Sequence, residues 1–150
     1  MPFPIAGESN LIVTGDAKAL VVLDTNGDSW PDFVVSRNNN SAFTFRNKGV
    51  AARQSLRVQL RGAIGNPTAI GAAVTVELAD GTRQTSEVQA GSGYFSQSDG
   101  ACFFGYPDGN PPREIRVTWP SGRETIHPWK GGGNTIVLTA PAANRQEPAR

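Results

Sequence analysis

The feature that most constrains the fold of this chain is a predicted hairpin over residues 115–126, with the sequence IRVTWPSGRETI. Apolar residues alternate with polar ones from Ile115 to Trp119, which is the period of a strand with one buried face. Pro120 fixes the backbone for the first corner of a turn, and Gly122 accepts the positive φ that closes it. We therefore predict a strand, a reversal and a returning strand, with the remaining strands packed on Trp119.

The composition favours an all-β protein with many turns. The chain of 150 residues contains 17 glycines and 11 prolines, and it has no helical run rich in Ala, Leu, Glu and Lys. Its formal charge is +1 with the basic residues scattered, which argues against nucleic acid as a partner. No apolar run approaches the roughly 20 residues needed to span a bilayer, so we expect no membrane span. The first four residues do not start a signal peptide, so a secreted parent would carry its signal upstream of this sequence.

Residues 24–32, with the sequence DTNGDSWPD, carry the strongest functional signal. Oxygen-bearing side chains occupy positions one, three, five and nine, and a main-chain carbonyl can serve as position seven. These residues are Asp24, Asn26, Asp28 and Asp32, with Trp30 for the carbonyl. Alternating oxygen ligands in a tight loop are typical of calcium sites, and crowded carboxylates repel one another without a cation. We predict that this loop binds Ca²⁺; the alternative is a surface turn rich in Asp and Asn that binds nothing.

The loop is not an EF-hand. An EF-hand needs Gly at position six and Glu at position twelve, and these places hold Ser29 and Val35. The flanking segments also read as strands rather than helices, and Gly27 permits the tight bend within the loop.

The N-terminal unit, residues 1–50, is predicted to be a four-stranded meander. Its expected strands are Leu11–Val13, Ala19–Leu23, Phe33–Val35 and Ala42–Phe45. The order of strand, Asp-x-Asn-Gly-Asp-x-x-Pro-Asp, Phe-Val-Val and Phe-Arg-Asn resembles one repeat of the FG-GAP or VCBS type. In that family each repeat is a propeller blade whose loop holds calcium, which implies the same five ligands here. One blade cannot bury both faces alone, so we expect it to be covered by the second unit, by another copy of the chain or by blades of a longer parent. Self-association through an edge strand at Leu11–Val13 is one predicted route.

The second unit, residues 55–139, is predicted to be a β-sandwich or a partly open barrel, followed by a flexible tail over residues 140–150. Asp80-Gly81 between two alternating runs predicts a hairpin, whose returning strand Thr82–Gln89 is mostly polar and suits a sheet edge. A last strand is expected at Thr135–Thr139.

Several motifs of the second unit resemble the ASPIC/UnbV domain. They are Arg61-Gly62 with Asn66, Ala69-Ile70-Gly71-Ala72, Gly93-Tyr94-Phe95-Ser96-Gln97, Phe104-Gly105 and Val117-Thr118-Trp119-Pro120-Ser121-Gly122. In that family the domain follows FG-GAP or VCBS repeats, and some members are encoded beside enediyne genes.

The sequence lacks the groups that a hydrolase or a zinc site would need. His127 is the only histidine, no Gly-x-Ser-x-Gly elbow is present, and the glycines at 131–133 lack the ending of a phosphate loop. Cys102 is the single cysteine, so no internal disulfide can form, and we predict that it is a small buried hydrophobe. We therefore predict that the chain is not an enzyme.

Four aromatic residues fall in or near loops: Tyr94, Phe95, Tyr106 and Trp129. Such residues either stack on sugars and anchor protein partners or cap the ends of the core. The leading hypothesis is a non-catalytic calcium-binding module of an extracellular or cell-envelope protein, used for adhesion or assembly, with a protein partner or self-association. The alternatives are an accessory protein of a biosynthetic pathway and a carbohydrate-binding module.

Overall fold

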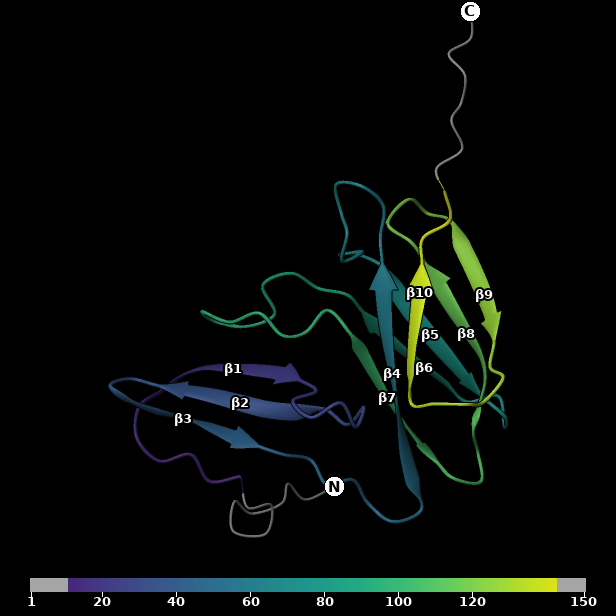
Figure 1. The fold of residues 1–150 in the computed structure, drawn as a ribbon. Helices are drawn as coiled ribbons and strands as arrows, with labels where there is room; N and C mark the ends of the chain where they lie inside the picture. The colour runs from purple at the N-terminus through teal and green to yellow at the C-terminus, as the bar shows by residue number, and fades with distance from the viewer. Residues whose placement is uncertain (1–10, 143–150) are drawn as a thin grey trace, which may run out of the picture.

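The computed structural model describes residues 11–142, which form ten strands in three sheets (Figure 1). The first sheet is an antiparallel meander in the order β1-β2-β3. Its strands are β1 (Ala17–Leu23), β2 (Asp32–Arg37) and β3 (Asn40–Phe45). None of the three sheets is closed into a barrel within these residues, so the predicted all-β class is confirmed.

The other two sheets face each other as a sandwich. One has the order β10-β4-β7, and its strands are β4 (Arg53–Arg61), β7 (Cys102–Pro107) and β10 (Thr135–Thr139). The other has the order β6-β5-β8-β9, and its strands are β5 (Ala73–Leu78), β6 (Arg83–Glu87), β8 (Pro112–Thr118) and β9 (Glu124–Pro128). Strand β10 runs parallel to β4, whereas all the other pairs are antiparallel.

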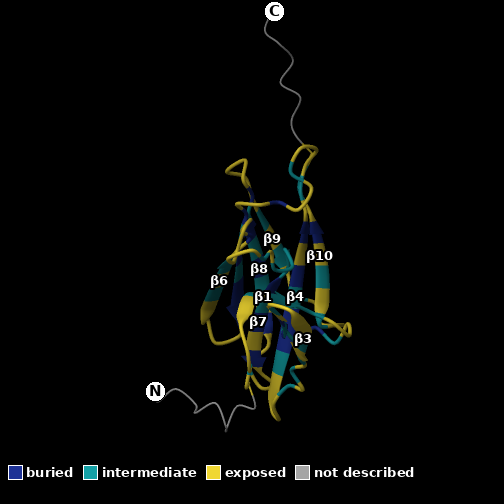
Figure 2. Cartoon of the chain, turned by 90° about the vertical axis from the view of Figure 1, so that its left-hand side faces the viewer, coloured by how far each residue is buried: buried dark blue, intermediate teal, exposed yellow. Residues whose placement is uncertain are grey.

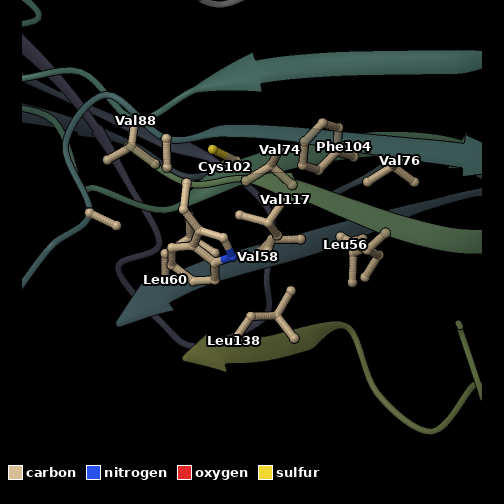
Figure 3. Packing of buried hydrophobic residues seen from close by; sticks show 14 of the residues in the cluster. Leu56, Val58, Leu60, Val74, Val76, Val88, Cys102, Phe104, Val117 and Leu138 are labelled. Carbon is tan, nitrogen blue, oxygen red and sulfur yellow. The ribbon is translucent and has the colours of Figure 1, made fainter. Parts of the chain in front are cut away.

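The hydrophobic core lies between the two sheets of the sandwich (Figure 3). Alternate residues of β4 point into it, and their side chains meet those of β5, β7, β8 and β10. The largest fully buried apolar side chains are Leu56, Val58, Val74, Val76, Ile115 and Val117. Of the meander's apolar residues only Val35 is buried, so the sandwich supplies most of the apolar stabilisation (Figure 2).

The hairpin predicted over residues 115–126 is confirmed as β8 and β9. Gly122 has φ +79°, and its N–H donates to the carbonyl of Trp119 at 2.8 Å, which closes the turn. Trp119 follows directly after β8, is 3% exposed and belongs to the core. Its indole N–H donates to Thr125 Oγ1 at 2.9 Å, so the ring's one polar group is satisfied.

The hairpin predicted at Asp80-Gly81 is also confirmed, with Gly81 at φ +86° and β6 at the edge of its sheet. On β5, the side chain of Glu77 is only 7% exposed and pairs with Arg83 at 2.8 Å and with Arg113. The hydrogen bond from Arg83 is the largest cause that holds the pKa of Glu77 below its ordinary value; burial opposes the shift, and the charge of Arg113 adds to it.

The prediction of a strand at Leu11–Val13 is wrong, and the meander has three strands rather than four. Leu11 and Ile12 are 44% and 53% exposed, so their apolar character does not reflect a buried strand face. The outer edge of β1 also has other partners, because Val22 accepts from Asp99 N at 2.9 Å and donates to Ser98 Oγ at 3.1 Å. The edge strand on which the predicted self-association was based is therefore not present at Leu11–Val13.

The end of the sandwich extends one residue past β10. Ala140 donates from its backbone N–H to the carbonyl of Arg61 at 2.8 Å and packs against the core. Most of the predicted tail, residues 143–150, lies outside the described residues.

Candidate functional site

The predicted calcium loop joins the end of β1 to the start of β2 and is folded around the carboxylate of Asp24. Oδ1 accepts the N–H groups of Gly27 at 2.7 Å and Asp28 at 3.2 Å, and Oδ2 accepts that of Ser29 at 2.9 Å. Two residues with positive φ make this possible, Gly27 at +78° and Ser29 at +68°. The backbone thus wraps the side chain at the first position of the loop.

Asn26 and Asp28 are bonded to each other and to the backbone. Asn26 Nδ2 donates to Asp28 Oδ2 at 2.8 Å, and the N–H of Trp30 donates to Asp28 Oδ1 at 2.9 Å. Asn26 is exposed and Asp28 is half-buried, so both side chains lie near solvent. Neither Asp24 nor Asp28 has an ion-pair partner in the described part of the chain.

Asp32 is the buried member of the set, with no exposed surface. Oδ1 accepts Asn47 N at 2.7 Å, and Oδ2 accepts Thr25 N at 3.0 Å together with the Thr25 hydroxyl. Burial is the largest single influence and would raise the pKa of Asp32, but the hydrogen bonds from Thr25 and Asn47 together outweigh it and lower that pKa. Asp32 is therefore an ionised carboxylate that ties the loop to the segment after β3.

The structure brings the five predicted ligands into one loop but does not make their carboxylates converge. Within residues 11–142, no group of three or more Asp, Glu, His or Cys side chains lies close enough to hold a metal ion. The reason is visible in the hydrogen bonds, since each carboxylate is directed at N–H groups of its own loop or of the connector. The donor set is nonetheless all oxygen, and a carboxylate can accept about four hydrogen bonds or metal contacts. The residues present match Ca²⁺ in the chemistry of their donor atoms but not in their arrangement, since the three carboxylates would have to turn toward one point and Asn26 would have to present its amide oxygen.

Ser29 docks the loop onto the sandwich. It is 3% exposed, and its hydroxyl bonds Thr135 Oγ1 of β10 at 2.6 Å. Its carbonyl accepts from Ser55 Oγ of β4 at 2.7 Å, in a fully buried hydrogen bond. The sequence pattern singled out Ser29 only as a departure from the EF-hand glycine and did not predict this docking role. Small polar residues in loops and hydroxyl residues near the starts of strands are common in any sequence. Their presence therefore could not have predicted that Ser29 contacts Ser55 and Thr135.

A second contact holds the meander to the sandwich on the other side of β1. Ser98 and Asp99 of the β6–β7 loop bond the backbone of Val22 in β1. The carboxylate of the same Asp99 pairs with Arg57 of β4 at 2.6 Å. Figure 1 shows this β6–β7 loop reaching over β1. Asp24 and Asp99 both line a hollow of about 330 Å³ between the two parts, so the loop is open to solvent there.

The remaining candidate residues are placed as follows. Cys102 is 3% exposed, and burial raises the pKa of its thiol, which confirms a small buried hydrophobe. His127 Nε2 lies 3.0 Å from Thr125 Oγ1. No helix in the described part of the chain is long and apolar enough to cross a membrane.

The four loop aromatics divide into two pairs. Tyr106 is 7% exposed and Trp129 packs against the core, so these two cap the sandwich. Tyr94 and Phe95 are 76% and 81% exposed, and their ring centroids lie 4.3 Å apart at the end of the β6–β7 loop. Phe95 has φ +54°, an uncommon conformation for an aromatic residue.

Comparison with known families identifies the sandwich. No curated protein matches the chain. Residues 62–145 match the family described as ASPIC and UnbV, a region that begins at the end of β4 and contains the hairpin of Trp119 and the last strand. The match covers more than half of the chain but starts after the loop of Asp24, so it identifies the sandwich and not the meander. The chain belongs to the ASPIC and UnbV family.

Proposed function

We propose that this chain is a non-catalytic calcium-binding module of an extracellular or cell-envelope protein, used for adhesion or assembly. One Ca²⁺ would be held by the side chains of four loop residues and by one carbonyl. These are Asp24, Asn26, Asp28 and Asp32, with the carbonyl of Trp30. The meander would then be a single repeat of the FG-GAP or VCBS type in front of the ASPIC/UnbV sandwich.

The observation that carries this proposal is the way the loop encloses Asp24. Four consecutive backbone N–H groups, from Asn26 to Ser29, point at one carboxylate, while the loop contains two further carboxylates with no cationic side chain paired to Asp24 or Asp28 among the described residues. A bound cation would neutralise this charge, and the oxygen-only donor set suits Ca²⁺. Asn26 would give up its hydrogen bond to Asp28 and present its oxygen instead.

Calcium binding would also fix the meander to the sandwich. Ser29 lies within the loop and makes a buried hydrogen bond with β4 and a partly buried one with β10. A cation that orders the loop would hold Ser29 in its positive φ and so favour the docked arrangement by mass action. If the module works outside the cell, an affinity of about 10⁻⁴ to 10⁻³ M would suit the calcium concentration there.

Assembly would use the outer edge of β3. This strand is at the edge of its sheet and is therefore available for pairing with another chain. Phe43 and Phe45 on this strand pack together with ring centroids 5.8 Å apart, and Arg37 lies 3.9 Å from the Phe43 ring centroid. This surface replaces Leu11–Val13 as the edge for a partner or for a second copy.

The proposal is tested by thermal unfolding in calcium, in magnesium and in chelator. Saturation at 100 times the Kd adds about 2.7 kcal/mol, which corresponds to a rise in Tm on the order of 10 °C. Magnesium should act much more weakly, because it demands a smaller and more regular site. Asp24→Asn should remove the calcium effect. Asp16→Asn is the matched control, because Asp16 is an exposed carboxylate paired only with Lys18 among the salt bridges. Identical melting curves in calcium and chelator would refute the calcium site.

A carbohydrate-binding module is the second candidate, and the exposed Tyr94–Phe95 pair favours it. The two rings are tilted by 56° to each other, so each exposed ring could stack on a sugar by its own face rather than as part of one flat platform. Retardation of the chain in gels that contain a panel of polysaccharides, lost in Tyr94→Ala and Phe95→Ala, would support this function. Unchanged mobility throughout the panel would count against it.

A further inference from the structure

A pocket of about 440 Å³ lies at the end of the sandwich where β4 ends and the chain leaves β10. Its walls come from the loop after β4, from the β8–β9 turn and from the segment after β10. Figure 1 shows these three segments together at one end of the molecule. The loop of Asp24 contacts β4 at Ser55, and the pocket begins at Gly62, so the two sites are roughly 20 Å apart along one strand.

The loop that forms one wall is closed by its own hydrogen bonds. Gly62 N donates to the carbonyl of Pro67 at 2.8 Å, and the amide of Asn66 bonds both the N–H and the carbonyl of Ile70 at 2.9 Å. Ala69 at φ +54° is fully buried beneath the loop. Because these groups are already paired, the wall is fixed before any ligand arrives, which lowers the entropic cost of binding.

The floor of the pocket is apolar. Pro120, Ala140 and Pro141 give it accessible surface, and Trp119, which is 3% exposed, reaches it with a small part of its ring; the indole N–H of Trp119 is occupied by Thr125. The ring therefore presents only carbon to the pocket. The volume lies in the range of about 300 to 1,000 Å³ in which proteins bind small molecules.

One charged side chain borders this apolar space. Arg123 is exposed and donates from Nη1 to the carbonyl of Ala142 at 2.8 Å. No carboxylate of the described residues pairs with it, a condition that it shares with Arg37, Arg46, Arg53 and Arg61, but Arg123 alone among these arginines lines the pocket. The remaining N–H groups of the guanidinium are suited to an anionic group of a ligand.

We propose that this pocket binds a small amphipathic carboxylic acid, with its apolar body against Trp119 and Pro120 and its carboxylate on Arg123. The pocket combines a rigid apolar floor with one cation that has no acidic partner. It therefore favours a ligand that has an apolar body and one negative charge. A neutral apolar molecule would leave Arg123 without an anion, and a highly charged one would lose the contact with the floor.

The test uses the full chain, in chelator and in calcium, with 2-naphthoate as the probe and 2-naphthamide as its uncharged match. Binding is followed by NMR through the indole N–H signals of the three tryptophans. We expect a saturable shift of the Trp119 signal by 2-naphthoate, in calcium and in chelator alike, and at least tenfold weaker binding of the amide. Arg123→Gln should weaken 2-naphthoate at least tenfold. Arg53→Gln, which changes an exposed arginine at the other end of β4, should leave it unchanged.

Several outcomes would overturn the proposal. These are the absence of a saturable shift at Trp119, equal binding of the acid and the amide, or unchanged binding in Arg123→Gln. A Trp119 signal that moves with protein concentration alone would identify a second copy as the occupant. Nuclear Overhauser contacts from residues 143–150 to Trp119 in the ligand-free chain would identify the chain's own C-terminal segment. Ala63→Phe places a ring in the pocket from an exposed position, and 2-naphthoate binding that survives it would place the probe elsewhere.

Discussion

Replacement of Trp119 by alanine should destabilise the sandwich more than any other change in the β8–β9 hairpin. The side chain is 3% exposed and contributes to the core from the end of β8. A buried tryptophan removes about 150 to 250 Å² from water, which at about 25 cal/mol per Å² is worth about 4 to 6 kcal/mol. The ring borders the pocket with only the small exposed part of its surface, so nearly all of its area counts toward this estimate.

We expect a loss of about 3 to 5 kcal/mol in the free energy of unfolding, the usual result of emptying an aromatic core position. Part of it comes from the hydrogen bond to Thr125, which contributes about 1 kcal/mol. The assay is urea denaturation followed by far-UV circular dichroism. Trp119→Phe is the companion variant, because it keeps a ring in the core and loses the N–H, and it should lie between the wild type and Trp119→Ala.

A loss below about 1 kcal/mol for Trp119→Ala would refute this reasoning, because it would place the residue among surface positions. The hairpin would then be peripheral to the fold. Equal losses in the alanine and phenylalanine variants would show that the hydrogen bond matters more than the packing of the ring.

Three further changes test other parts of the structure. Ser55→Ala should cost about 1 to 3 kcal/mol in urea denaturation, since it leaves the carbonyl of Ser29 buried without its partner; a smaller loss would show that the contact is loose. Gly62→Ala should cost about 1 to 3 kcal/mol or prevent folding, because the new methyl group would lie 2.0 Å from the carbonyl oxygen of Asn66; a wild-type melting curve would contradict this loop structure. Glu77 has a lowered pKa, so its ion pairs stabilise the fold above about pH 4.3 and this contribution is lost as the pH falls through the folded-state pKa. Glu77→Gln should therefore show a weaker loss of stability between pH 6 and pH 3 than the wild type, and parallel curves would count against the pairing.

The sandwich was largely predictable because its local signals agree with its tertiary structure. Alternation up to Trp119 and the turn at Gly122 predicted β8, β9 and the buried ring. Asp80-Gly81 predicted the β5–β6 hairpin and its edge position for the same reason, namely that turn chemistry and side-chain period are local properties.

The features that the sequence could not supply depend on distant partners. The parallel pairing of β10 with β4 joins residues far apart in the chain, and a short apolar run does not reveal the direction of its neighbour. The run Leu11–Val13 has strand composition but no strand forms there, and the edge of β1 that it was expected to pair with is bonded by Ser98 and Asp99 at Val22. Local composition does not show that an edge already has a partner.

The candidate site was half predictable. Spacing alone predicted a tight loop between two strands, and the positive φ at Gly27 agrees with the expected bend, while the oxygen ligands remain a prediction. The burial of Asp32 and its bonds to Thr25 and Asn47 were not foreseen, because they depend on where the segment after β3 returns. The docking role of Ser29 needed the positions of Ser55 and Thr135 on strands of another sheet.

The most direct test of the central proposal is a calorimetric titration of calcium into the full chain after exhaustive removal of divalent ions. We predict one Ca²⁺ per chain, with a Kd of about 10⁻⁴ to 10⁻³ M if the module works outside the cell. Asp24→Asn should abolish the binding heat and Asp16→Asn should leave it unchanged, although both variants lose one carboxylate. The absence of binding heat in the wild type, or equal binding in Asp24→Asn and Asp16→Asn, would contradict a calcium site in the loop between β1 and β2.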